Sequence, residues 1–166
     1  MRRILEGSSL KETLLSEELE TAELYLNIEN IRFSDEINYQ IKIADSINID
    51  QIKIPSLVLQ PFLENAIWHG LSSKEGGKKL LVEVKKKDDI HLQISIIDNG
   101  VGRKASEEIK EHRILKRKSV GIDITTERLA NFSKDYENDF EVTIEDLTDN
   151  KGVAQGTKIT LKIPTI

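Results

Sequence analysis

The stretch QPFLENAIWHG, residues 60–70, decides the fold that we expect of this chain. Pro61 suits the first turn of a helix, because its missing N–H would have had no partner there. Gly70 suits the position just past the end, where a left-handed residue satisfies the last carbonyls. The apolar residues recur at helical spacing and predict one core-facing stripe, made of Leu59, Leu63, Ala66, Ile67 and Gly70. The stretch therefore predicts one short helix.

Three polar side chains, Glu64, Asn65 and His69, lie on this otherwise apolar helix. Asn65 and His69 are four residues apart, so they share a face one turn from each other. Burying an acid, an amide and an imidazole is costly unless each finds a partner. Two interpretations stay open for this stretch alone: Asn65 bonds nearby backbone beside a half-exposed His69, or the polar face is a binding site.

A second stretch joins a strand to a carboxylate and two glycines. Residues 90–97 alternate as a half-buried strand does, with apolar side chains at Ile90, Leu92, Ile94 and Ile96. The strand runs into DNGVG, where Asp98 is followed by Gly100 and Gly102. Glycines let backbone approach a flat ligand closely. A long charged segment follows instead of a return strand, so DNG here is not a simple hairpin turn.

Two further pieces contain glycine. In SVGI, residues 119–122, a helix is expected to start beside Gly121, and N–H groups at a helix start can meet phosphate. Gly156 and Thr157 stand just before the last expected strand, which contains Ile159, Leu161 and Ile163.

These pieces, in this order, resemble the ATP-binding domains shared by gyrase, MutL and the histidine kinases, known as the Bergerat fold. LENAIWHG resembles the N-box, DNGVG the first glycine box and SVGI the second. The wording LQPFLENAIWHG, preceded by YLNIENIRF, is similar more narrowly to the LytS-type sensor histidine kinases. The resemblance runs from about Leu19 to Pro164, which is nearly the whole chain.

The expected architecture is α+β, a two-layer α/β sandwich. The resemblance implies a mixed, mostly antiparallel sheet, and the pattern gives about five strands and about three helices on one face. Residues 1–12 are expected to be the frayed remnant of an upstream segment, and residues 13–166 the ATPase domain. The polar segment 103–118 would be its ATP lid, with a short helix around Ala105 to Ile114. A first helix should start near Thr13 or Ser16 and bury a face that contains Leu15, Leu19, Ala22, Leu26 and Phe33, widened by Leu24, Ile28 and Ile31.

Composition excludes several classes of protein. The chain has 166 residues, 38% hydrophobic and 32% charged, which is enough for one ordinary globular domain. The net charge is −5 and the isoelectric point about 5.3, so nothing suggests direct nucleic-acid binding. There is no cysteine, which excludes disulfides, thiolate chemistry and cysteine-ligated zinc. No apolar run approaches the length of a membrane span.

The resemblance also implies roles for individual residues, with ATP and Mg2+ as cofactors. Asn65 would ligate Mg2+ through its amide oxygen, with Glu64 assisting as a second ligand or polarising base. Asp98 would accept a hydrogen bond from the adenine amine, and Gly100 and Gly102 would line the adenine slot. The phosphates and the remaining adenine contact would involve His69, Gly121 and Thr157.

The chain departs from the family pattern in three places. Trp68 stands where these kinases usually have lysine, Ser119 replaces the first glycine of the second glycine box, and Ile124 replaces a frequent asparagine. Two alternatives therefore stay open. One is a Bergerat ATPase or serine-directed kinase outside the histidine kinases, and the other is a degenerate nucleotide-binding module. YLNIENIRF argues against the first, and Asn65 argues against the second.

The family phosphorylates a histidine in an NPHFLFN-like motif on an upstream dimerisation helix. The three histidines of this chain, His69, His91 and His112, lie in no such motif. The resemblance therefore implies a catalytic fragment that phosphorylates a helix outside this chain. It also implies a homodimer of the full-length protein, a cognate response regulator of the LytTR type, and a cytoplasmic domain of a protein anchored in the inner membrane.

Overall fold

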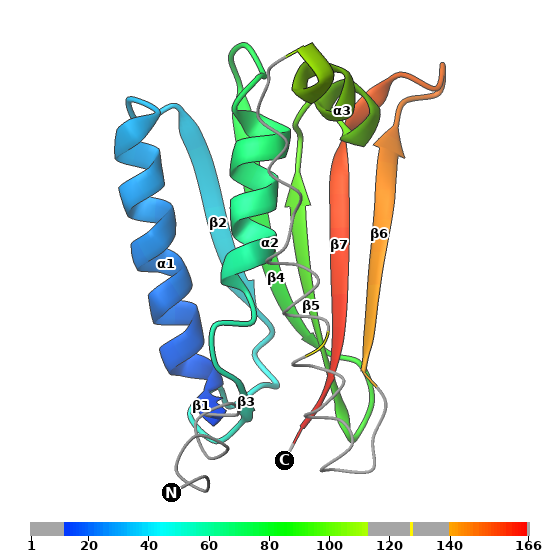
Figure 1. Ribbon diagram of the computed structural model, residues 1–166. Coiled ribbons are helices and arrows are strands. Elements are labelled where there is room, and N and C mark those ends of the chain that lie inside the picture. The colour runs from blue at the N-terminus through cyan, green and yellow to red at the C-terminus, as the bar shows by residue number, and fades with distance from the viewer. Residues whose placement is uncertain (1–11, 113–126, 128–139, 166) are drawn as a thin grey trace, which may run out of the picture.

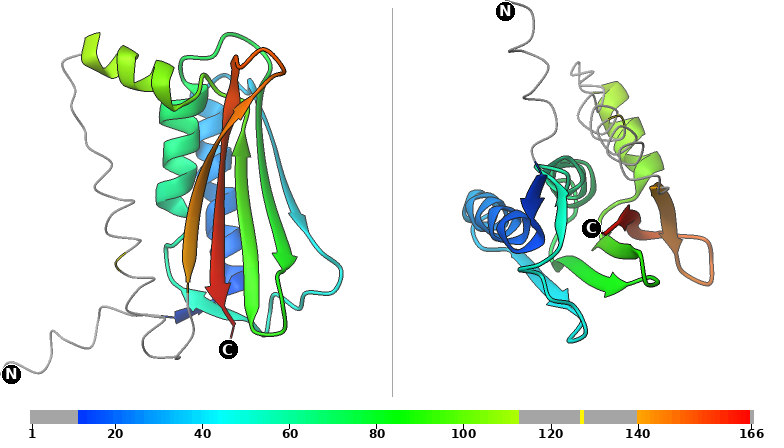
Figure 2. Two further views of the ribbon diagram at one scale, coloured as in Figure 1. Left: turned by 90° about the vertical axis from the view of Figure 1, so that its right-hand side faces the viewer. Right: turned by 90° about the horizontal axis from the view of Figure 1, so that it is seen from below.

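The computed structural model describes residues 12–112, 127 and 140–165, which form a sheet with helices on one face (Figures 1 and 2). The elements are, in chain order, β1 Glu12–Leu14, α1 Leu15–Arg32, β2 Ile37–Ile43, β3 Lys53–Pro55, α2 Gln60–Glu64, η1 Asn65–Leu71, β4 Lys78–Lys86, β5 His91–Asp98, α3 Arg103–His112, β6 Glu141–Thr148 and β7 Ala154–Pro164. The expected two-layer α/β sandwich is confirmed.

Within the described residues, the main sheet has five strands in the order β2-β4-β5-β7-β6. β2 runs parallel to β4, and the other neighbouring pairs are antiparallel, so the sheet is mixed and mostly antiparallel as expected. A parallel pair needs a crossover connection, and here the crossover carries α2 and η1. This connection lays the central helix against the sheet face (Figure 1).

A second, two-stranded sheet pairs β1 with β3 and was not expected from the sequence. Thr13 lies opposite Ile54, and the N–H of Leu15 donates to the carbonyl of Ile52 at 2.8 Å. The small sheet thereby fixes the start of α1. Three-residue strands that pair across more than thirty residues leave too short an alternation to be recognised in the sequence.

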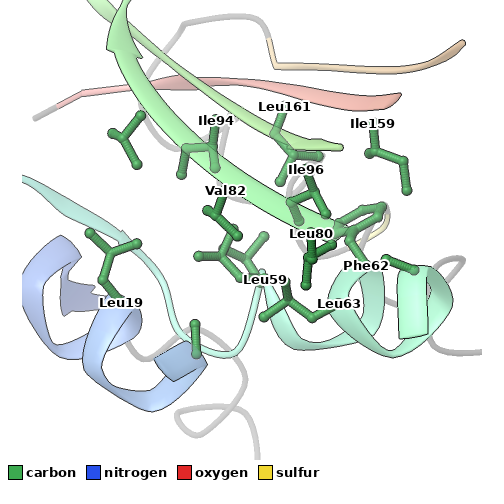
Figure 3. Packing of buried hydrophobic residues seen from close by; sticks show 14 of the residues in the cluster. Leu19, Leu59, Phe62, Leu63, Leu80, Val82, Ile94, Ile96, Ile159 and Leu161 are labelled. Carbon is green, nitrogen blue, oxygen red and sulfur yellow. The ribbon is translucent and has the colours of Figure 1, made fainter. Parts of the chain in front are cut away.

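The core lies between the central helix and the sheet (Figure 3). Phe62 and Leu63 of α2 are fully buried against β4, β5 and β7, whose inward side chains include Val82, Ile94 and Leu161. Burying each such side chain contributes about 1.5–3 kcal/mol. The alternation predicted for these strands is confirmed, except that Ile90 lies in the hairpin before β5 and is 50% exposed.

One prediction about α1 is wrong. Leu15, Leu19, Ala22 and Leu26 are buried as expected, but Leu24, Ile28 and Ile31 are 64%, 55% and 71% exposed. Leu24 and Ile28 are each two residues from Leu26, about 200° around a helix of 3.6 residues per turn. They therefore point away from the sheet, and the helix buries one stripe instead of a widened face.

The central helix does not end at Gly70. After Glu64 it continues as the π-helix η1 through Leu71, and the N–H of Ser72 donates to the carbonyl of Ile67, five residues back, at 2.8 Å. Gly70 is absent from the residues of positive φ, so the expectation of a left-handed cap there is wrong. Single-turn π-segments inside helices are frequent at functional sites.

Several expectations lie outside the described residues. They concern the remnant at residues 1–11, the second half of the expected lid at 113–118, and the second glycine box with Gly121 and the helix after it. The first half of the expected lid is described and forms α3, close to the short helix expected there.

Candidate nucleotide site

Asp98, the last residue of β5, is a buried carboxylate with a side chain only 3% exposed. The N–H of Gly100 donates to its Oδ1 at 2.8 Å. Burial raises the pKa of Asp98 to about 6 from an ordinary 3.8, although the N–H groups of Gly100 and Thr157 act in the opposite direction. This buried carboxylate at the end of β5 can accept a further hydrogen bond from a ligand.

Glycines surround this carboxylate because backbone passes close to it. A methyl group on Gly70 would lie 2.6 Å from Asp98 Oδ1, and one on Gly100 would overlap the backbone of Gly70. The N–H of Val101 donates to the carbonyl of Gly70 at 3.1 Å, which joins η1 to the loop after β5. Gly70 is therefore required for close approach to Asp98 and Gly100, and this replaces its expected role as a cap.

The next strand completes the enclosure of Asp98. Thr157 of β7 lies opposite Asp98 in the ladder and is 4% exposed. Gly156 has a φ of +133°, and any side chain there would overlap the Asp98 carbonyl. The structure thus brings together Gly70, Asp98, Gly100 and Thr157.

Asn99, between the carboxylate and Gly100, has a structural role that the sequence did not reveal. Its Oδ1 accepts from the N–H of Lys79 at 2.7 Å, and its Nδ2 donates to the carbonyl of Gly77 at 2.8 Å. These bonds hold the loop after β5 against the start of β4. An asparagine before glycine is so common in turns that the pattern alone gives no sign of this bridge.

Hydrogen bonds hold the first residues of the expected lid in place. Gly102 has a φ of +84°, which favours glycine, and its carbonyl accepts from the N–H of Ser106 in α3. Arg103 then binds Asp146 of β6 through two hydrogen bonds of 2.7 Å, and this pairing holds the pKa of Asp146 below its ordinary value. α3 therefore starts from a point tied to the opposite edge of the sheet.

The three polar residues of the central helix differ in their surroundings. Glu64 is exposed and its Oε1 accepts from Gln60 at 3.0 Å, whereas Asn65 and His69 are half-buried. Within residues 12–112, 127 and 140–165, the Asn65 side chain makes no hydrogen bond, so its amide oxygen is available to a ligand. The interpretation that Asn65 bonds nearby backbone is therefore not supported.

Trp68 packs on the end of α1. Its ring lies 5.6 Å from that of Phe33, with the planes tilted by 55°, and the Lys78 ammonium lies 5.8 Å from the centre of the Phe33 ring. Trp68 is 46% exposed. This departure from the family pattern therefore gives a packing contact between η1 and α1.

Glu18 supports the site and was not predicted from the sequence. It is 4% exposed, and its two carboxylate oxygens accept the N–H groups of Leu57 and Leu59 at 2.8 and 2.9 Å. These bonds hold the turn before α2, where Leu57 has a φ of +56°. The signal was its position on the buried stripe of α1 between Leu15 and Leu19, a costly place for an unpaired acid.

The described residues include no group of three or more histidine, cysteine, aspartate or glutamate side chains that could hold a metal ion. A metal bound here would therefore need oxygens from its ligand, as Mg2+ commonly does with phosphates. Among the same residues, no helix is long and apolar enough to cross a membrane.

Comparisons with known proteins found relatives in sequence and in fold. No family model matches the chain. It is 33% identical over 115 residues to the uncharacterized protein YwpD of Bacillus subtilis, covering 69% of this chain and 40% of YwpD. It is 38% identical over 102 residues to the sensor protein LytS of Oceanobacillus iheyensis and 31% over 101 residues to LytS of Staphylococcus aureus, each alignment covering 61% of this chain and 17% of LytS. The chain thus spans less than half the length of these relatives.

Solved structures of low sequence identity share the fold. The mycobacterial sensor histidine kinase MprB matches with a TM-score of 0.61 at 15% identity, covering 94% of this chain and 97% of that one. The catalytic domain of histidine kinase ThkA matches with a TM-score of 0.58 at 16% identity, covering 93% and 96%. The chain is therefore a sequence relative of the LytS sensor histidine kinases, and its fold is that of a histidine kinase catalytic domain.

Proposed function

We propose that this chain is the ATP-binding catalytic domain of a two-component sensor histidine kinase. It would transfer the γ-phosphoryl group of ATP to a histidine on a dimerisation helix outside this chain. The observation that carries the proposal is the buried Asp98 carboxylate, enclosed by Gly70, Gly100 and Gly156. This arrangement places one strong hydrogen-bond acceptor beside backbone that carries no side chains. A flat base with an amino group needs such an acceptor and such space.

At the adenine end, Asp98 would accept a hydrogen bond from the exocyclic amine. Guanine carries an oxygen at that position, so its two lone pairs would face a buried carboxylate. Gly100 and Gly102 would leave room for the ring, and Thr157 would bond the base through water. A buried acceptor left without its donor costs about 1–3 kcal/mol, which favours adenine over guanine.

At the phosphate end, the chain would mainly position and neutralise charge. Asn65 would ligate Mg2+ through the amide oxygen that has no partner in the described residues, with Glu64 nearby as a second ligand or base. The metal would neutralise charge that develops on the phosphates. His69 would lie beside the phosphate chain, Gly121 would offer N–H groups, and residues 103–118 would form the lid.

The proposal extends to the full-length protein through its relatives. Sensor histidine kinases in general act as dimers and pair with response regulators. For this chain we propose a homodimer joined through the upstream dimerisation helix, a cognate response regulator of the LytTR type, and a cytoplasmic domain of a protein anchored in the inner membrane.

A nucleotide titration tests the proposal. By calorimetry, ADP should bind more tightly than GDP by about tenfold or more, which corresponds to the loss of one hydrogen bond to a charged group. Adding Mg2+ should strengthen ATP binding, and Asn65→Ala should reduce that gain more than it reduces metal-free ADP binding.

Asp98→Asn should remove the preference for adenine, whereas Asp88→Asn serves as the matched control because Asp88 precedes the opposite end of the same strand. Comparable affinities for ADP and GDP in the unmodified chain would refute the role of Asp98. Equal losses of metal-dependent and metal-free binding in Asn65→Ala would make Asn65 a structural residue.

A further inference from the structure

The π-helical segment η1 determines which residue of the central helix lies against Asp98. Its backbone hydrogen bonds join residues five apart, as between the Ser72 N–H and the Ile67 carbonyl at 2.8 Å, whereas those of an α-helix join residues four apart. Residues near the end of η1 are therefore set back by about one position relative to an uninterrupted α-helix. One position corresponds to about 100° around the helix axis and about 1.5 Å along it.

This π-helical register has a direct consequence for the enclosed carboxylate. If the central helix stayed α-helical throughout, the place that Gly70 occupies would be taken by His69. A Cβ atom at that place would lie 2.6 Å from Asp98 Oδ1 and 2.9 Å from its Cγ, which is too close for either group to stay where it is. The enclosure of Asp98 therefore needs the register of η1 as much as it needs the glycine.

The side chain of Trp68, in the middle of η1, distinguishes the two registers. Backbone hydrogen bonds do not, because an α-helical turn also pairs its N–H groups with carbonyls. The Trp68 ring lies 5.6 Å from the Phe33 ring at a tilt of 55°, an arrangement that aromatic pairs favour. A return to the α-helical register would rotate Trp68 about the helix axis and separate the two rings. The contact with Phe33 therefore stabilises the π-helical register.

The ring on which Trp68 packs is fixed independently of the central helix. Phe33 follows the last residue of α1, and α1 and the central helix lie side by side on one face of the sheet (Figure 1). Lys78, the first residue of β4, places its ammonium 5.8 Å from the centre of the Phe33 ring. Lys78 is 6% exposed and pairs with Glu36 at 2.8 Å. Trp68 therefore contacts a surface that belongs to α1 and the sheet.

We propose that Trp68 is a positioning residue, which holds η1 in its π-helical register by packing on Phe33 and thereby places Gly70 against Asp98. Trp68 would act through this register and not by contact with a ligand. Its role rests on the proposed function only for what the register serves, which is the binding of adenine at Asp98. The register itself can be measured without a nucleotide.

NMR of the nucleotide-free chain measures the register. Burial raises the pKa of Asp98 to about 6, and η1 contributes to that burial. Trp68→Ala should lower this pKa toward 3.8 and speed exchange of the Val101 N–H, which donates to the Gly70 carbonyl, by about tenfold. Trp68→Phe keeps a ring and should change neither. The amide of Ile94, in the middle of β5, should stay protected, which verifies folding.

Calorimetry with ADP then measures what the register serves. Trp68→Ala and Phe33→Leu should each weaken ADP binding by about tenfold, and the double variant no further, because all three remove the same contact. Ile31→Ala is the matched control, since Ile31 is an apolar residue of α1 that is 71% exposed, and it should bind ADP normally.

The possible outcomes separate this role from the proposed function. An Asp98 pKa that stays near 6 in Trp68→Ala, or additive losses of ADP affinity in the double variant, would overturn the role of Trp68. If the pKa falls in Trp68→Ala but the unmodified chain binds no ADP, the register depends on Trp68 as proposed and the nucleotide assignment is wrong.

Discussion

The Asp98 carboxyl changes its charge close to the pH of most assays. Its pKa of about 6 results first from burial, and the N–H groups of Gly100 and Thr157 offset only part of that cost. At neutral pH the carboxyl group is ionised, although its burial disfavours the charge. A ligand that donates a hydrogen bond to it relieves this cost, so binding and ionisation are linked.

The first prediction concerns the pH dependence of nucleotide binding. Because the adenine amine donates to the ionised carboxylate, ADP affinity should be constant above about pH 7 and fall as the pH drops through about 6. The limiting slope is about tenfold per pH unit. Calorimetry from pH 5 to 8 measures this, and Asp98→Asn should lose the dependence. An ADP affinity that does not change over this range would contradict the linkage.

The second prediction concerns stability without nucleotide. The pKa of Asp98 is higher in the folded than in the unfolded chain, so its contribution is fully present below about pH 4 and is lost as the pH rises through about 6. A shift from 3.8 to about 6 corresponds to at most about 3 kcal/mol. The free energy of unfolding of Asp98→Asn, relative to the unmodified chain, should therefore rise from pH 4 to pH 7. Urea unfolding of both proteins measures it, and parallel pH profiles would refute the cause assigned here.

For single residues, the sequence indicated which side chains have the right chemistry, but it did not indicate which backbone segments lie close together. Asp98 and Gly100 were recognised as a pair because a carboxylate followed by glycine is a local pattern. The need for glycine at position 70 depends on η1 passing against Asp98 and Gly100, which are about thirty residues further along. No local pattern contains that contact, so Gly70 was assigned to a cap.

Among the elements, the turn before α2 depends on α1. Glu18 accepts two backbone N–H groups from this turn, and Leu57 within it has positive φ, a strained conformation for a residue with a side chain. Burial raises the pKa of Glu18 despite these bonds. The first helix therefore positions the start of the helix that carries Asn65 and His69.

The third prediction tests this dependence. Glu18→Gln keeps one oxygen acceptor and replaces the other by an amide NH2 group, which cannot accept, so one buried N–H loses its partner. The free energy of unfolding should fall by about 1–3 kcal/mol. Glu20→Gln is the matched control, because Glu20 is exposed on the same helix and makes no hydrogen bond or ion pair among the described residues. Thermal unfolding compares them, and equal effects would show that Glu18 does not support the turn.

Elements with long regular patterns could be predicted, and those that depend on distant partners could not. β4, β5 and β7 follow clear alternations, and α1 has a clear buried stripe. The outer apolar residues of α1 could not be placed from the sequence, because periodicity identifies two apolar stripes on the helix and does not say which one contacts the sheet. The π-helical turn was also missed, because its sequence suits an α-helix equally well.

For the molecule as a whole, the fourth prediction concerns what the chain cannot do alone. Transfer to histidine needs the γ-phosphorus in line with an imidazole nitrogen at near-attack distance. His69 is expected beside the phosphates as a positioning group, and His91 lies at the far end of β5 with its ring bound to Asp88. Incubation with ATP and Mg2+ should therefore give no stable acid-labile label on this chain.

A complementary experiment supplies the missing acceptor. A separate dimerisation-helix fragment with an NPHFLFN-like motif should become labelled, slowly, because no tether raises its effective concentration. His112→Ala is the informative variant, since His112 ends α3 within the expected lid. Label on this chain alone that disappears in His112→Ala would mean that the chain carries its own acceptor.

The sheet order also has a consequence for how copies of the domain meet. Among the strands that the structure describes, β2 and β6 form the two edges, and an edge strand presents backbone groups that could add a strand from another molecule. β6 carries exposed acids at Glu141, Glu145 and Asp146, of which Asp146 is already bound by Arg103 and Glu145 lies 3.9 Å from Lys158. Two β6 strands that pair edge to edge would bring these acids close to those of the other copy. In the proposed dimer two such domains are held at high local concentration. The acids on β6 would then disfavour a continuous intermolecular sheet formed through this edge.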